Sequence, residues 1–304
     1  MNKRVTNPSL ELRHYMEKNQ FTTAIKRTTC LFILTMLLSS VLSADNRNRF
    51  DPWLVYYSNE ATIDSFSPYR MLVLDSDFHP PLADLKARGK LLLGYISLGE
   101  VEFHRAYFAE VKRQGILLDE NPFWKNSYFI DMRQAYWPKK VITTLIPQIL
   151  EKGFDGIFLD TLDNPLHLEN QDPVRYRGMK DAAARLVKGI RLHFPYIKIM
   201  MNRAYGLIDE VSPYIDMILG ESVYADYDPA NKDYRLVEPS LYEFQIEQLR
   251  KAVLKNPDIG LYTLDYWNPD DQDMLRKIYH VQRQNGFIPH VSTILLNRII
   301  KEPK

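Results

Sequence analysis

Short apolar runs that alternate with longer helical stretches constrain the fold more than any other feature of this sequence. Continuous apolar runs are typical of parallel strands buried on both faces, and strands that alternate with helices indicate βαβ units. The runs comprise residues 53–57, 71–74, 91–96, 156–159, 197–201, 217–219, 259–264 and 287–291. Eight such units predict one α/β domain over residues 50–300, a single closed (β/α)8 TIM barrel.

The stretches between these runs have the apolar spacing of helices. In the last of them, Met274, Ile278 and Val281 recur at intervals of four and three residues, as on one face of a helix. No Gly-x-Gly-x-x-Gly follows the first run and no phosphate-binding loop is present, which argues against a nucleotide-binding sheet. A further apolar run, residues 128–131, is predicted to belong to a long loop between the third and fourth strands. The expected helices comprise residues 138–152, 176–193, 242–256 and 270–285.

The N-terminal segment has the pattern of a secretory signal. Lys26 and Arg27 precede an apolar run over residues 30–42, and the small residues Ser43 and Ala44 follow it. A positive region, a short apolar region and a small-residue site are the three parts of such a signal. The run is shorter than the ~20 residues that a membrane-spanning helix needs. We therefore expect export, with cleavage near this site.

Residues 1–44 are thus predicted to be a signal peptide, which leaves a periplasmic or extracellular protein. An uncleaved membrane anchor and a translation start at Met16 are the alternatives. Cleavage would remove six Lys and Arg and two Glu, leaving 33 basic against 36 acidic residues. This net charge of −3 gives no support for binding to nucleic acid, which favours basic patches.

Cysteine and histidine usage gives no support for a metal or cofactor. Cys30 is the only cysteine and lies in the predicted signal, so the mature domain would have no disulfide and no cysteine metal site. The seven histidines lack His-x-x-x-His or His-Glu-x-x-His spacing. The serines lack the Gly-x-Ser-x-Gly setting of a nucleophile elbow. We predict neither a cofactor nor serine hydrolase chemistry.

Acids recur where the predicted strands end. Active sites of such barrels lie at the carboxyl ends of the strands, and Asp160, Glu221 and Asp265 follow three of them. Each acid alone is equally explained as a cap of the next helix, but their recurrence favours a shared site. Hydrolysis of a glycosidic bond commonly needs two carboxyl groups, and we predict that Asp160 and Glu221 are this pair.

The roles within the pair are a weaker hypothesis. Asp160 is followed by Thr161, Asp163 and Asn164, polar neighbours expected to donate hydrogen bonds or to hold water. We therefore favour Asp160 as the ionised partner. The longer side chain of Glu221 favours it as the proton donor, and the reverse assignment stays open.

Aromatic side chains near the predicted strand ends are candidates for stacking on sugar rings. These are Tyr56, Tyr95, Tyr224, Tyr266 and Trp267. Flat rings bury large apolar area, and core packing is the alternative for Tyr56 and Tyr95 in particular. We predict that some of this set, Trp267 foremost, bind substrate.

Four segments resemble one known family. Gly-Tyr-Ile-Ser-Leu-Gly-Glu at 94–100, Gly-Phe-Asp-Gly-Ile-Phe-Leu-Asp-Thr-Leu-Asp at 153–163, Glu-Ser at 221–222 and Leu-Asp-Tyr at 264–266 are similar to those of endo-α-1,4-polygalactosaminidases, glycoside hydrolase family 114. The resemblance spans about residues 50–295. It implies a (β/α)8 barrel that cleaves galactosamine-containing exopolysaccharide within the chain.

The resemblance also implies roles for particular residues. It places the catalytic carboxylates on Asp160 and Glu221, and it implies that the same cleft is lined by Tyr95, Glu100, Asn202 and Asp265. One departure is Arg203, where we expect a smaller or uncharged residue. A cation there would repel an unacetylated amino sugar unless an acid pairs with it.

Three functions compete on these observations. The leading hypothesis is an exported, endo-acting glycoside hydrolase of an amino-sugar polysaccharide. A glycan-binding barrel without turnover is the second, and a barrel hydrolase of another amino-sugar polymer is the third. A pure interaction scaffold would have no need for acids gathered at strand ends.

Overall fold

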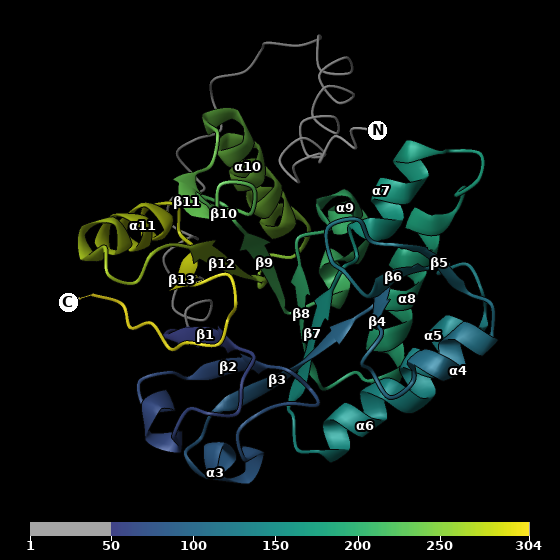
Figure 1. The fold of residues 1–304 in the computed structure, drawn as a ribbon, viewed down its shortest axis with the longest axis horizontal. Coiled ribbons are helices and arrows are strands. Elements are labelled where there is room, and N and C mark those ends of the chain that lie inside the picture. The colour runs from purple at the N-terminus through teal and green to yellow at the C-terminus, as the bar shows by residue number, and fades with distance from the viewer. Residues whose placement is uncertain (1–49, 304) are drawn as a thin grey trace.

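The computed structural model of the protein describes residues 50–303, which form one barrel of parallel strands (Figure 1). The strands hydrogen-bond in the order β1-β2-β3-β7-β8-β9-β12-β13. They comprise β1 (Trp53–Tyr56), β2 (Met71–Leu74), β3 (Leu91–Ser97), β7 (Gly156–Asp160), β8 (Lys198–Asn202), β9 (Met217–Glu221), β12 (Gly260–Tyr266) and β13 (Ile288–Ser292). Each of the eight predicted runs is a strand of this sheet, which confirms the predicted fold.

The first and last strands nearly close the barrel. The indole Nε1 of Trp53 donates a hydrogen bond to the carbonyl oxygen of Ile288 at 3.0 Å. Beyond the strands, the amide of Tyr57 donates to the carbonyl oxygen of Leu296 at 2.7 Å. These contacts join chain ends that are more than 230 residues apart, so the edge strands are covered.

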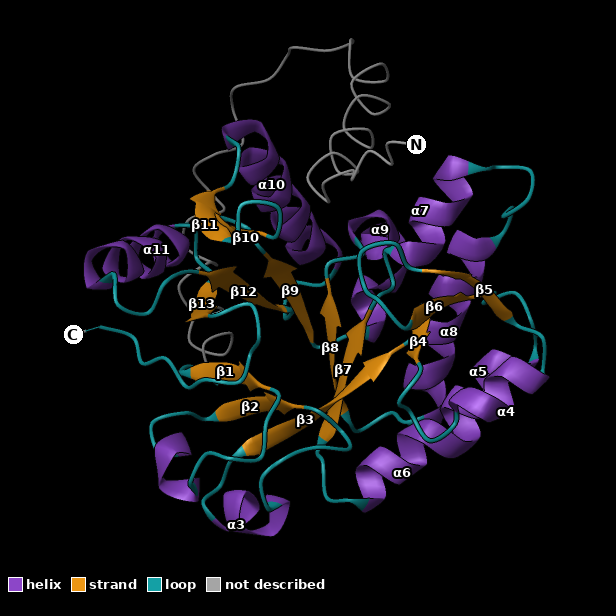
Figure 2. Ribbon diagram, viewed as in Figure 1, coloured by secondary structure: helices purple, strands orange, loops and turns teal. Residues whose placement is uncertain are grey.

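The helices surround the sheet (Figure 2). Three predicted helices are single elements, α8, α10 and α11. The predicted helix over 138–152 is divided into α5 and α6 by a π-helical turn over Val141–Leu145. The helices comprise α3 (Leu82–Ala87), α4 (Phe108–Arg113), α5 (Tyr136–Lys140), α6 (Ile146–Glu151), α7 (Asn164–Gln171), α8 (Met179–His193), α9 (Ile208–Val211), α10 (Pro239–Lys255) and α11 (Gln272–Gln284).

Two insertions extend the end of the barrel where the strands finish, which we call the barrel mouth. Between β3 and β7 a small antiparallel sheet forms in the order β4-β6-β5, with β4 over Glu100–Glu102, β5 over Leu117–Glu120 and β6 over Ser127–Ile130. The extra apolar run at 128–131 falls in β6, inside the predicted long loop. After β9, strands β10 (Ala225–Asp228) and β11 (Asp233–Leu236) form a hairpin.

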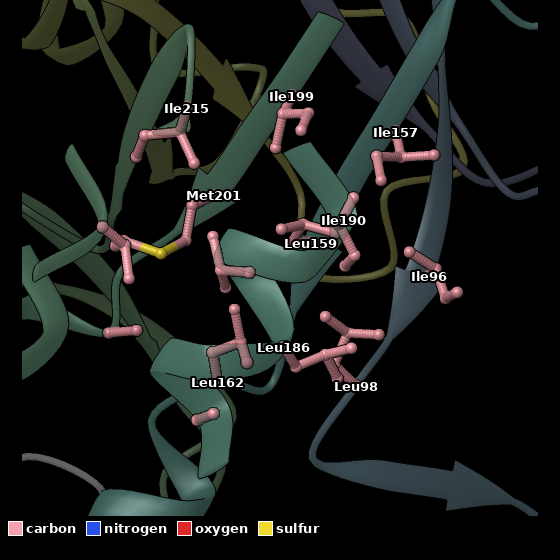
Figure 3. Packing of buried hydrophobic residues seen from close by; sticks show 14 of the residues in the cluster. Ile96, Leu98, Ile157, Leu159, Leu162, Leu186, Ile190, Ile199, Met201 and Ile215 are labelled. Carbon is pink, nitrogen blue, oxygen red and sulfur yellow. The ribbon is translucent and has the colours of Figure 1, made fainter. Parts of the chain in front are cut away.

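Two hydrophobic clusters fill the two sides of the barrel wall. The interior cluster contains Trp53 and Val55 of β1 and no helix residue, whereas the outer cluster contains Leu54 and Tyr56 together with the helices. This is the two-residue alternation of a strand. Figure 3 shows the outer layer between α8 and the sheet, with the side chains of Leu186, Ile190, Ile157, Leu159, Ile199 and Met201. Each such side chain contributes roughly 1.5–3 kcal/mol on burial.

The predicted signal peptide, residues 1–44, lies outside the described residues. Among residues 50–303 no helix has both the length and the apolar character that crossing a membrane requires.

Candidate active site

Three neighbouring strands end in polar residues that point into the barrel. Asp160 is the last residue of β7, Asn202 of β8 and Glu221 of β9. Side chains two positions apart on a strand share a face, and the residues two positions earlier all belong to the interior cluster: Phe158, Met200 and Leu219. The strands are adjacent and parallel, so the three side chains meet at the barrel mouth.

The same backbone turn follows each of these residues. Thr161, Arg203 and Ser222 have φ angles of 62°, 49° and 52°, in the left-handed region that non-glycine residues rarely occupy. Backbone strain of this kind concentrates at functional sites. The repeated turn ends the three strands in the same way and fixes the direction of the side chain before it.

Asn202 links the two candidate catalytic acids. Its Nδ2 donates hydrogen bonds to Asp160 Oδ1 at 2.9 Å and to Glu221 Oε2 at 2.6 Å. These two carboxyl oxygens therefore cannot be farther apart than the sum of those distances, 5.5 Å. The hydroxyl of Tyr266 donates to the other oxygen of Glu221 at 2.5 Å. Asp160, Asn202 and Glu221 thus form one connected polar group.

Asp160 is the acid whose proton affinity changes most. Burial, followed by the negative charges of Glu221 and Asp163, raises its pKa from 3.8 to about 7, against the lowering effect of the Asn202 hydrogen bond. Of the polar neighbours expected to favour its ionised form, Thr161 contacts the carboxyl group only through its backbone amide, which acts to lower the pKa. Asn164 Nδ2 donates to Glu100 instead, and the Thr161 hydroxyl donates to the backbone oxygen of Asp160. The surroundings of Asp160 therefore favour its protonated form at higher pH than for an ordinary aspartate.

Tyr57 is a residue of the barrel mouth that the sequence reasoning missed. The predicted neighbour Tyr56 lies on the outer face, where its ring packs against Phe66 at 5.5 Å and its hydroxyl accepts a hydrogen bond from the Ala61 amide. Alternation places Tyr57 on the inner face, where its ring meets Tyr95 at a centroid distance of 5.3 Å. The two-residue alternation of strands could have indicated Tyr57. In a strand that is apolar throughout, however, the sequence does not show which residues point inward.

Two other predicted cleft residues, Glu100 and Asp265, are buried and hydrogen-bonded within the protein. Glu100 is 4% exposed, and its carboxylate accepts hydrogen bonds from three neutral side chains: Asn121, Ser127 and Asn164. Burial raises the pKa of Glu100 despite these donors. Glu100 therefore joins the inserted sheet to the start of α7 and does not line the cleft.

Asp265 lies on the outer face of β12, and the adjacent Tyr266 lies on the inner face. The Asp265 carboxylate is fully buried and accepts hydrogen bonds from the amides of Tyr224 and Ala225 at 2.7 and 2.9 Å and from Gln282 Nε2 at 2.5 Å. Burial raises its pKa to about 6. It therefore anchors the loop after Glu221 to α11.

The unexpected cation Arg203 has an acidic partner. Its Nη2 lies 3.5 Å from Asp163 Oδ2. Burial acts to lower the pKa of Arg203, but the charges of Asp163 and Glu221 outweigh burial and raise it. The pairing meets the condition under which this residue is compatible with an amino sugar.

Aromatic residues continue from the barrel mouth along the β10–β11 hairpin. The Trp267 ring lies 6.0 Å from that of Tyr234, which lies 5.3 Å from that of Tyr227. Tyr227 and Tyr234 also pack against the interior cluster. Tyr224, by contrast, packs against Tyr242 of α10 at 5.4 Å. The hairpin thus places partly buried rings against the interior cluster of the barrel.

No group of three or more His, Cys, Asp or Glu side chains within residues 50–303 is arranged to hold a metal ion. One acidic cluster at the mouth, Asp75, Asp77 and Glu102, surrounds Arg105. The absence of a metal or cofactor stays a prediction.

A (β/α)8 barrel whose mouth carries two carboxyl groups, linked through the asparagine of the strand between them, has the architecture of barrel glycoside hydrolases. The sequence profile of glycoside-hydrolase family GH114 matches residues 40–302. The chain therefore belongs to family GH114 and is a glycoside hydrolase, as the sequence motifs predicted.

Known structures share this fold. The glycoside hydrolase domain of PelA from Pseudomonas aeruginosa superimposes with a TM-score of 0.74 at 23% identity, covering 84% of this chain and 99% of that one. Ega3 of Aspergillus fumigatus, solved in complex with galactosamine, gives a TM-score of 0.59 at 13% identity, covering 82% and 94%. An uncharacterised protein of Deinococcus radiodurans is 24% identical over 249 residues, 77% of this chain and 76% of its own.

Proposed function

We propose that this protein is an exported, endo-acting hydrolase of a galactosamine-type polysaccharide, with Asp160 and Glu221 as its catalytic carboxyl groups. The observation that carries the proposal is the bridge from Asn202 to both acids at the end of the barrel where catalytic residues gather. Family membership supports the reaction class, and the galactosamine complex of Ega3 supports the substrate class.

The separation of the carboxyl groups favours retention of configuration. Retaining glycosidases hold their two carboxyl groups about 5–5.5 Å apart, whereas inverting enzymes need roughly 6.5–9.5 Å to admit a water molecule. The upper limit of 5.5 Å between Asp160 Oδ1 and Glu221 Oε2 fits the first geometry. One carboxylate would attack the anomeric carbon while the other protonates the leaving oxygen, and water would then hydrolyse the glycosyl-enzyme bond.

The pair must carry one proton for this reaction. Burial, and then the negative charge of Glu221, raise the pKa of Asp160 to about 7. This raised pKa favours Asp160 as the proton donor, opposite to the assignment favoured by side-chain length. Leaving-group dependence distinguishes the roles, because loss of the acid hurts poor leaving groups most.

The charges at the mouth suit an amino sugar. Asp163 pairs with Arg203, and a singly protonated Asp160–Glu221 pair keeps one negative charge. An ammonium substituent is attracted to this charge, whereas a carboxylate on the sugar is repelled. This supports a galactosamine-type polymer over an acidic one.

Reducing-end release from a panel of purified exopolysaccharides tests the proposal. We expect release of oligosaccharides from a galactosamine-containing polymer by the wild type and its loss in Asp160→Asn and Glu221→Gln. If Glu221→Gln alone keeps activity on an activated aryl glycoside, Glu221 is the proton donor; the same pattern in Asp160→Asn assigns that role to Asp160. Binding of polymer without turnover by the wild type would instead favour the glycan-binding alternative.

Export is the part of the proposal that rests on Lys26 to Ala44 alone. We expect the mature protein from its native host to begin near Ala44 or Asp45 and to lie outside the cytoplasm. Mass spectrometry of the N-terminus in fractionated cells tests this. An intact N-terminus on a cytoplasmic protein would refute export and leave the hydrolase proposal standing.

A further inference from the structure

Arg105 lies at the barrel mouth between β2 and the inserted sheet, and carboxylates fix its side chain on every side. Nε contacts Glu102, Nη1 contacts Asp75 and Asp77, and Nη2 contacts Asp75 and Glu102, at distances from 2.8 to 3.4 Å. The side chain is 5% exposed. All five N–H donors of the guanidinium group are used, so both its position and the orientation of its plane are set.

This fixed cation contacts the ring of Tyr95, which packs against the interior cluster. Arg105 Cζ lies 5.5 Å from the ring centroid of Tyr95, within the ~6 Å range of a cation–π interaction. The Tyr95 ring in turn meets Tyr57 edge-on at 5.3 Å and stacks on Phe158 of β7 at 6.3 Å. The guanidinium group therefore supports a row of rings at the mouth.

Tyr57 and Tyr95 lie within electrostatic reach of the carboxyl pair. The pKa of the Tyr57 hydroxyl is raised by burial and then by the charges of Asp160 and Glu221. The pKa of the Tyr95 hydroxyl is raised by burial and then by Asp160. Neither hydroxyl is hydrogen-bonded within the described part of the chain. Both are therefore available to a hydroxyl or amino group of a sugar bound at the acids.

We propose that Arg105 is a positioning residue that holds Tyr95, and through it Tyr57, as a wall of the sugar-binding site. The inference rests on the proposed function, because the wall matters only if a sugar binds beside Asp160 and Glu221. Arg105 itself touches no substrate. The acids of its cage come from the end of β2 and from the inserted sheet, so the cage also fixes the insertion against the barrel.

Arg105→Lys is the informative variant. Lys keeps the positive charge but presents it as a compact point charge without the planar fork, so Tyr95 loses its flat support. Arg191→Lys is the matched control. Arg191 Nη2 donates to Asp216 Oδ2 at 2.5 Å and is likewise largely buried, but Asp216 directly precedes β9, at the amino end of the barrel.

A double-mutant cycle with Tyr95→Ala separates positioning from general stability. With a soluble galactosamine oligosaccharide, we expect Arg105→Lys to raise KM about fivefold and Tyr95→Ala about tenfold, with smaller changes in kcat, since a lost binding contact raises KM. The double variant should match Tyr95→Ala alone, because Arg105 acts through that ring. Arg191→Lys should leave KM unchanged.

Two results would overturn the proposal: a double variant whose KM rises by the product of the two single effects, or an Arg105→Lys variant with the KM of Arg191→Lys. If Arg105→Lys does not fold, Asp75→Asn replaces it. We then expect KM to rise about fivefold, and a KM equal to that of Arg191→Lys would overturn the proposal. If the wild type shows no turnover, the hydrolase proposal fails, and the cycle is then measured as oligosaccharide affinity by titration.

Discussion

Asp160, which is half-buried, and Asp265, which is fully buried, are two acids near strand ends of the same barrel, and their surroundings differ. Both have a raised pKa, about 7 and about 6. Asp265, on the outer face, accepts hydrogen bonds from two amides and Gln282. The inner-face carboxyl group of Asp160 accepts hydrogen bonds from one side chain, Asn202, and from one amide, that of Thr161.

The difference shows what distinguishes a structural acid from a reactive one. At Asp265 the protein offsets the cost of burial with its own donors, which anchors a loop. At Asp160 burial and then the nearby negative charge of Glu221 raise the pKa to about 7. Holding the Asp160 carboxyl group in these surroundings lowers the stability of the fold. It also brings the pKa close to the pH at which proton transfer is most efficient.

We expect the largest difference between the two acids in catalytic activity, with substitution of Asp160 far more harmful than substitution of Asp265. We expect Asp160→Asn and Glu221→Gln to lose about 10²- to 10⁴-fold in polymer hydrolysis, the range for removing an acid or base. Asp265→Asn should lose less than about tenfold, because it retains an oxygen for the loop amides. Reducing-end assays measure both. Equal losses at Asp160 and Asp265 would break the comparison, and full activity in both Asp160→Asn and Glu221→Gln would reject the carboxyl pair.

For stability we expect the opposite order, with Asp265 contributing more to the free energy of unfolding than Asp160. Asp265→Ala leaves the amides of Tyr224 and Ala225 and the Gln282 side chain without their acceptor, which should lower the free energy of unfolding by about 3 kcal/mol. Chemical denaturation measures the change. Asp273→Ala is the control, since that side chain is 92% exposed and its removal should cost less than about 0.5 kcal/mol.

Asp160→Asn should stabilise the protein at neutral pH. The folded pKa of Asp160 is about 7 against an ordinary 3.8, so the folded state binds more protons between these values, and this acid reduces stability progressively as pH rises from about 4 to 7. We expect a gain of about 2 kcal/mol at pH 7.5 that disappears near pH 4. Thermal melts across this range measure it; a gain that is independent of pH would show that the titration of Asp160 is not its source.

Trp267 tests how far the functional surface of the mouth extends beyond the acids. Trp267→Ala should weaken binding of a galactosamine oligosaccharide by about 1 kcal/mol, roughly fivefold, as for loss of one stacking contact. Tyr196→Ala is the control, because Tyr196 is 95% exposed and precedes β8 at the opposite end of the barrel. Unchanged affinity on titration would exclude Trp267 from the sugar-binding site.

The sequence alone determined the barrel and the place of its site. Eight apolar runs separated by helical stretches leave little choice but a closed parallel sheet buried on both faces. Parallel strands then bring their carboxyl ends to one end of the barrel, so Asp160, Asn202 and Glu221 had to gather there. The family motifs on these strands carried the reaction class.

The tertiary structure decided which face each residue occupies. Tyr56 and Tyr57, like Asp265 and Tyr266, are adjacent in sequence and point to opposite sides of the wall. A strand that is apolar on both faces shows no alternation from which to read the direction, and a shift of one residue exchanges the faces. For this reason the sequence reasoning chose Tyr56 and Asp265, and only packing identified Tyr57 and placed Asp265 outside the cleft.

The sequence also could not predict the distances between side chains at the mouth or the partners of the charged residues. The separation of the two carboxyl groups, the pairing of Arg203 with Asp163 and the acid cage of Arg105 each join segments that are distant in the chain or depend on side-chain direction. Strand ends specify which residues share the mouth. The backbone turns and the packing of the insertions decide, to within an ångström, which of these residues touch.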